Sequence, residues 1–144
     1  DKDAAAAVTN HGDVMITEAD GSVATATAGN TQLIGAALSY SAASTADTAV
    51  KIADHPDQDF LTTDDGDTTT LAQTHIGSNA DHIAGTGNAT LMRSAHQIDI
   101  SRITTVTEGF RLLQVVRNPA YAIGANSILR VNVNEHALKT TSGV

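Results

Sequence analysis

The sequence predicts an all-β protein, a small β-barrel or sandwich of short antiparallel strands with one short helix. Three observations carry this prediction: several short runs alternate apolar and polar residues, turn residues recur about every eight to twelve residues, and one segment alone has helical capping signals. Aromatic residues make up only 3% of the 144-residue chain. Because aromatic side chains bury the largest areas, a core of Val, Ile and Leu is thin. We therefore expect contacts with other subunits to add stability.

The N-terminal half should begin with a β-hairpin. The dipeptide Asp20-Gly21 lies between two alternating runs, a pattern typical of a tight hairpin turn. A later apolar run contains Gly35, which predicts a β-bulge. Thr70 has capping-box spacing and Gly77 can end a helical turn, so one short helix is expected at 71–76. The strands expected in this half are 14–17, 22–25, 33–38 and 48–53.

The C-terminal half contains the strongest strand patterns. Residues 110–117 are apolar on both faces at the centre, which is typical of a strand buried on two sides. Asn118-Pro119 should end this strand. Residues 127–135 alternate, with Leu129, Val131 and Val133 directed inward. A shorter strand is expected at 97–100.

The chain divides into an N-terminal arm and one folded region. Residues 1–10 are predicted to form a flexible, extended arm, because their alanines offer little surface to bury. Such an arm could become ordered by adding a strand to a neighbouring subunit. Residues 11–144 form a single β-rich domain, either as one unit or as two lobes of about 11–67 and 68–144.

Charge is distributed unevenly. The net charge is −8, which argues against a protein that binds nucleic acid by neutralising phosphates. Residues 1–82 hold 13 of the 16 acidic residues, whereas 6 of the 8 basic residues lie in 83–144. One interpretation is an acidic surface with accidental clustering. The other is a molecule with an acidic outward side and an Arg-bearing contact side.

Metal-binding patterns are weak in this sequence. The chain has no cysteine, and its histidines form neither His-x-x-x-His nor His-Glu-x-x-His. They are interpreted as scattered surface or loop residues. The acidic segment 54–67 does not match an EF-hand, because Leu61 and Thr63 stand at ligand positions before Gly66. An irregular calcium site stays open as an alternative to a solvated loop. The six histidines are His11, His55, His75, His82, His96 and His136.

The sequence predicts no enzyme. It lacks a Gly-x-Ser-x-Gly elbow, and Gly85-Thr86-Gly87-Asn88 lacks the third glycine of a dinucleotide-binding loop. We therefore expect no catalytic residue, no cofactor and no metal. The minority alternative is a hydrolase built around His75, Asp81 and His82. No apolar run approaches the roughly 18 residues needed to cross a bilayer, and the first residues do not resemble a signal peptide.

The order of these patterns resembles the capsid decoration proteins of tailed bacteriophages, also called cement or capsid-stabilising proteins. The resemblance covers about Gly12 to His136, and its motifs are structural rather than catalytic. The pieces that carry it are Gly12-Asp13-Val14-Met15, Asp20-Gly21-Ser22-Val23, Leu33-Ile34-Gly35, Val50-Lys51-Ile52, residues 54–60, Ile76-Gly77, Asp81-His82-Ile83, Gly85-Thr86-Gly87-Asn88, residues 94–100, residues 110–116, Asn118-Pro119 and residues 128–136.

The resemblance implies a structural virion protein on the outer capsid surface, made in the host cytoplasm. It would bind the major capsid protein as a homotrimer and stabilise contacts between capsid subunits, without nucleic acid or membrane as partner. The alternative is another virion surface module, such as a tail or fibre domain that binds glycan or receptor. Arginine is favoured at interfaces, and the arm could dock on a neighbour. The expected contact residues are Ala4, Ala5, Val8, Arg93, Arg102, Arg111, Arg117 and Arg130.

Overall fold

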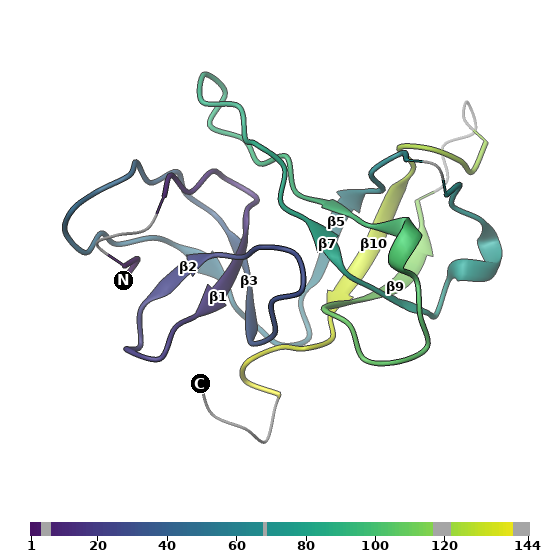
Figure 1. The fold of residues 1–144 in the computed structure, drawn as a ribbon, viewed down its shortest axis with the longest axis horizontal. Coiled ribbons are helices and arrows are strands. Elements are labelled where there is room, and N and C mark those ends of the chain that lie inside the picture. The colour runs from purple at the N-terminus through teal and green to yellow at the C-terminus, as the bar shows by residue number, and fades with distance from the viewer. Residues whose placement is uncertain (4–6, 68, 117–121, 140–144) are drawn as a thin grey trace.

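The computed structural model describes residues 1–3, 7–67, 69–116 and 122–139, and its strands form two groups side by side (Figure 1). The first sheet has four antiparallel strands in the order β2-β1-β3-β4. It contains only residues from the N-terminal part of the chain. Its strands are β1 (Val14–Thr17), β2 (Val23–Thr25), β3 (Leu33–Ala37) and β4 (Ile52–Ala53).

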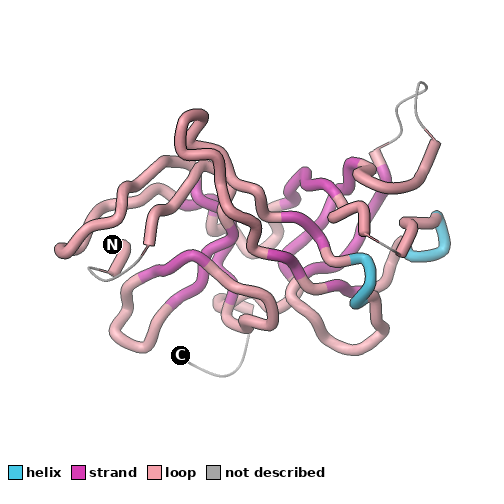
Figure 2. The backbone as a smooth tube through the Cα atoms, turned by 45° about the horizontal axis from the view of Figure 1, so that its top comes forward, coloured by secondary structure: helices cyan, strands magenta, loops and turns pink. Residues whose placement is uncertain are grey.

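The second sheet also has four antiparallel strands, in the order β5-β10-β9-β6. A two-stranded sheet pairs β7 with β8, and two single-turn 3₁₀ helices complete the fold (Figure 2). The elements are β5 (Asp59–Thr63), η1 (Gln73–His75), β6 (Asn79–Ala80), β7 (His82–Ile83), β8 (Gln97–Ile98), η2 (Ile100–Arg102), β9 (Phe110–Val115) and β10 (Ile128–Val133).

The all-β prediction is confirmed. The described residues form no closed barrel, and the arrangement is consistent with a small β-sandwich. The helix expected at 71–76 is shorter than predicted, a 3₁₀ turn at Gln73–His75, and η2 was not anticipated. Residues 59–63, part of the acidic segment interpreted as a solvated loop, form the edge strand β5 instead.

The opening hairpin and the bulge at Gly35 follow the local sequence. β1 pairs with β2 across the Asp20-Gly21 turn. Between β1 and β3 the register passes from Met15–Gly35 to Ile16–Leu33, so Ile34 is the extra residue of a bulge. Gly35 has a φ of 131°, and an added Cβ would lie 1.9 Å from the Ala53 carbonyl oxygen. Only glycine therefore lets β4 approach β3 here.

Strand β9 differs from the expectation of burial on both faces. Its register with β10 shifts so that Leu112 faces Val131 while Gln114 faces Arg130, which leaves Leu113 as a bulge residue. Phe110, Leu112 and Val115 are buried, whereas the intervening side chains are partly or fully exposed. The sequence places Leu112 and Leu113 next to each other, which is typical of a strand buried on both faces. The bulge at Leu113 explains why only one face is buried.

The hydrophobic core joins the two sheets. Its main cluster combines Val14 and Leu33 of the first sheet with the inward face of the second. Leu129, Val131 and Val133 are buried as the alternation predicted. A smaller cluster, formed by Met15, Val23 and Ala37, lies on the other face of the first sheet.

The described residues Lys2 and Thr9 of the expected arm contact the first sheet and its loops. Lys2 is buried and bridges to Val23 and Thr48, and Thr9 bridges to Ser41. β5, which belongs to the first of the two lobes considered as an alternative, pairs with β10 of the second. The change of sheet therefore falls between β4 and β5.

Candidate functional site

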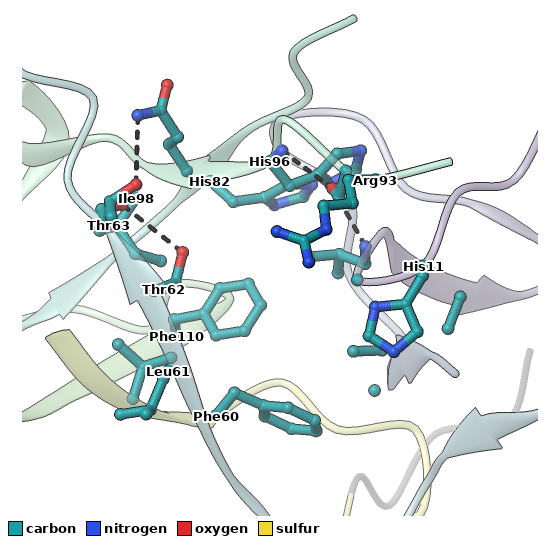
Figure 3. A pocket seen from close by; sticks show the side chains of 18 of the residues that line it. His11, Phe60, Leu61, Thr62, Thr63, His82, Arg93, His96, Ile98 and Phe110 are labelled. Carbon is teal, nitrogen blue, oxygen red and sulfur yellow. Dashed lines mark hydrogen bonds between the residues drawn. The ribbon is translucent and has the colours of Figure 1, made fainter. Parts of the chain in front are cut away.

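A cleft of about 650 Å³ lies where the two sheets meet. One wall comes from β1 and β3, the other from β5 and β10, and the segment that leads into β8 closes one side (Figure 3). The apolar lining residues are Val14, Ala36, Ala37, Leu38, Phe60, Leu61, Ile98, Phe110, Ile128 and Val131, together with the glycines Gly12 and Gly35. The polar lining residues are His11, Thr62, Thr63, His82, Arg93, Ser94, His96 and Gln97. Its size and mixed lining are typical of small-molecule sites.

His96 joins the two sheets at this cleft. Its Nδ1 accepts a hydrogen bond from the Val14 amide at 3.3 Å, so the neutral ring carries its proton on Nε2. Nε2 lies 3.6 Å from the Asp13 carboxylate, and both side chains are almost fully buried. Burial lowers the pKa of His96 to about 4, although Asp13 opposes the shift. The ring is therefore neutral at pH 7 and acts as a polar wall of the cleft.

His82 stacks on His96. The ring centroids are 5.4 Å apart with an interplanar angle of 18°, and Phe110 contacts His82 edge-on. Neither nitrogen of His82 has a hydrogen bond of good geometry among the described residues; its Nδ1 lies 3.4 Å from Asp81. Burial lowers the pKa of His82, against the opposing effect of Asp81. A second neutral imidazole thus faces the same cleft.

These findings correct the interpretation of the histidines as surface or loop residues. His82, His96 and His136 have buried side chains, and two of them form the stacked pair. A strand was expected at 97–100, but its pairing partner was not. The antiparallel pairing of β8 with β7 places His82 opposite Ile98, close to His96.

His75, Asp81 and His82, considered as the centre of a hydrolase, do not line one cleft together. Asp81 accepts hydrogen bonds from the amides of Gly29 at 2.6 Å and His82 at 2.7 Å, and Arg102 lies 3.4 Å away. This carboxylate anchors a loop of the first sheet. His75 lies on η1, where its Nδ1 accepts a hydrogen bond from the Ala72 amide. His75 is also absent from the described lining of the cleft.

A group of carboxylates lies outside the cleft. Asp65, Asp67 and Asp99 each place an oxygen within 4.8 Å of the others. Asp99 also accepts a hydrogen bond from the Ser101 amide at 3.0 Å. The sequence indicated the acidic segment 54–67 but not Asp99, which lies between β8 and η2. Oxygen ligands of this kind suit a hard cation, but exposed acidic groups also cluster without one.

Those of the expected contact residues that the structure describes are spread over several elements. Ala4, Ala5 and Arg117 lie outside the described residues. Val8 is exposed beside the first sheet, and Arg93 lies at the cleft.

The remaining expected arginines are spread over other elements. Arg111 of β9 lies opposite Asn132 of β10, and Arg130 is two residues before Asn132 on the same strand. Both arginines therefore lie on the outer face of the second sheet. Arg130 is paired with Asp59, and Lys139 lies 3.2 Å from Asp57. Two basic residues of the C-terminal half therefore pair with carboxylates of the acidic segment 54–67.

A hairpin at residues 84–95 projects beyond the sheets (Figure 1). Its stem is held by backbone hydrogen bonds between Asn88 and Arg93, and the Asn88 side chain accepts hydrogen bonds from the Thr90 and Leu91 amides. Leu91 and Met92, at the turn, are 64% and 46% exposed. The hairpin thus presents apolar side chains away from the core.

Comparison with known proteins yields no relative: no family profile, no curated protein and no solved structure matches the chain. Among the described residues, no helix has the length and apolar character needed to cross a membrane.

Proposed function

We propose that this chain is a structural virion protein that binds the outside of an assembled capsid and stabilises contacts between major capsid protein subunits. The projecting hairpin 84–95 is the observation that supports this role. Leu91 and Met92 are displayed on a turn whose backbone is tied by Asn88. Apolar side chains held in this way favour a protein contact, because their burial by a partner removes them from water without much loss of backbone freedom.

The composition gives further support. A core of aliphatic residues with 3% aromatics stabilises the isolated chain modestly, and contacts repeated over a shell add to it. The net charge of −8 favours protein partners over nucleic acid. The proposal includes a homotrimer on the outer capsid surface, synthesised in the host cytoplasm.

The test uses purified protein and expanded capsids that lack it. Wild-type protein should bind in a saturable way and raise the temperature at which the capsids rupture. The double variant Leu91→Ser, Met92→Ser should keep its fold but bind at least about tenfold more weakly, because two apolar side chains leave the interface. The control Leu138→Ser changes a residue that is 65% exposed outside the hairpin and should bind as wild type does.

Equal rupture temperatures with and without the protein would reject the capsid role. Gel densitometry of purified virions separates the alternative, a tail or fibre module that binds glycan or receptor. A high copy number per particle agrees with a decoration protein, whereas a few copies agree with a tail component. Light scattering after size-exclusion chromatography tests the trimer.

A further inference from the structure

We propose that the cleft between the two sheets binds an amphipathic carboxylate, a small molecule with an apolar aliphatic or aryl body and one carboxylate group. This proposal is independent of the capsid role. It concerns residues of both sheets and the base of the projecting hairpin, whereas the capsid test changes residues at the tip of that hairpin.

The apolar part of the ligand would lie between the two sheets. Phe60 and Phe110 face the same space in Figure 3, and Ile98 and Val131 continue that wall. A cleft of about 650 Å³ is within the range that holds small molecules. Burial of a ligand's apolar surface against these side chains would supply most of the binding free energy.

The charge of the cleft selects the polar group. The protein carries a net charge of −8, but no acidic residue is among the described residues that line the cleft. Arg93 and His11 provide the cationic or proton-donating groups there. A carboxylate is therefore complementary to the cleft, whereas an ammonium group is not.

Arg93 is available to the ligand. Its backbone pairs with Asn88, but no hydrogen bond or ion pair of its guanidinium group is found among the described residues. In Figure 3 the guanidinium extends over the cleft between His96 and the phenylalanines. A planar guanidinium can hold a carboxylate through two parallel hydrogen bonds.

The neighbouring carboxylates do not occupy this position. Asp13 lies beyond the His96 ring and accepts a hydrogen bond from the Asn10 amide at 2.7 Å. Asp81 lies beside His82 and holds the amide of Gly29 at 2.6 Å. Both carboxylates already accept hydrogen bonds from backbone amides, which leaves Arg93 and His11 as the groups for an incoming anion.

The experiment titrates the ¹⁵N-labelled chain with three probes that share one alkyl body: octanoate, octanol and octylammonium. Octanoate should bind saturably and shift the amide signals of Phe60, His96 and Phe110. Octylammonium should bind at least about tenfold more weakly, because its positive charge would lie near the Arg93 guanidinium and no carboxylate is among the described lining residues.

Two variants separate the contributions of charge and shape. Arg93→Gln should weaken octanoate binding at least about tenfold and leave octanol binding unchanged, since a charge-assisted hydrogen bond is lost. Ala36→Leu fills part of the cleft and should weaken octanoate and octanol alike. The control Arg111→Gln removes another exposed arginine, on the outer face of β9, and should bind all three probes as wild type does.

Three results would overturn the proposal. Absence of saturable octanoate binding would reject the site, and shifts confined to Leu91 and Met92 would place binding on the hairpin instead. Equal affinity for octanoate and octylammonium would reject selection by Arg93. Arg93 is exposed, so the Gln variant should fold even if Ala36→Leu does not.

Discussion

The two four-stranded sheets are stabilised by different kinds of side chains. The second sheet buries a continuous face of aliphatic residues, including Leu112, Leu129 and Val131. The first sheet has a small separate cluster around Met15, and the segments that flank its strands bury several polar side chains. The buried polar residues of this N-terminal part are Lys2, Thr9, Asn10, Asp13 and Ser41.

Around the first sheet, directed hydrogen bonds of these flanking segments therefore add to a smaller apolar cluster. Lys2 Nζ donates to the carbonyls of Ala7 and Ala42 at 2.9 and 2.7 Å. Asp13 accepts from Asn10 and lies next to His96, which reaches it from the other half of the chain. Aliphatic packing tolerates small shifts, whereas hydrogen bonds need their partners in place, so the first sheet should depend more on individual contacts.

The largest expected effect tests the difference in packing. Leu129→Ala removes a buried side chain from the main core and should lower the free energy of unfolding by about 2–5 kcal/mol, near the upper end of that range. Met15→Ala, in the smaller cluster, should lower the free energy of unfolding by an amount near the lower end of that range. Urea denaturation of both variants measures this. A loss at Met15 equal to that at Leu129 would contradict the comparison.

The second prediction tests the polar contacts of the first sheet. Lys2→Met keeps the length of the side chain but leaves the Ala7 and Ala42 carbonyls without their donor. The free energy of unfolding should fall by about 1–3 kcal/mol. The matched control Lys51→Met, at an exposed site, should change it by less than about 0.5 kcal/mol. Equal values for the two variants would show that the Lys2 contacts contribute little.

The smallest expected effect concerns the histidine at the junction of the sheets. The pKa of His96 is lowered to about 4 in the folded protein, from 6.5, so between these values the unfolded chain binds more protons. Stability from this group is therefore present above pH 6.5 and is lost as pH falls toward 4. The loss between pH 7 and pH 5 should be on the order of 1–2 kcal/mol for this one group.

The variant His96→Asn isolates that contribution. Its amide oxygen can accept the Val14 amide hydrogen as Nδ1 does, but it does not titrate. In this variant the difference in unfolding free energy between pH 7 and pH 5 should be smaller by the contribution of His96. Part of the acid sensitivity should remain, because His82 is unchanged. Denaturation curves at both pH values measure it. An unchanged difference would contradict the assignment to His96.

Most strands could be predicted because their signals are local. The Asp20-Gly21 turn and the alternation of Leu129, Val131 and Val133 each lie within one short segment, and the structure has both. β5 was missed because Asp59 and the threonines that follow Leu61 resemble a loop, although pairing with β10 makes them a strand. Tertiary pairing overrode the local preference there.

The site was far less predictable. Its residues come from segments as distant as His11 and Val131, and no spacing along the chain connects them. Arg93 was expected at a contact with other subunits, but nothing local placed it over an apolar cleft. The buried histidines were missed because burial depends on what the rest of the chain lays over them.

The amino-acid sequence by itself determined the all-β class, the opening hairpin and the inward face of β10, since strand alternation and turn chemistry act between near neighbours. Only the tertiary structure decided the cleft, the stack of His82 on His96 and the pairing of Arg130 with Asp59. Each of these joins residues far apart in the chain, and their contact follows from how the two sheets pack.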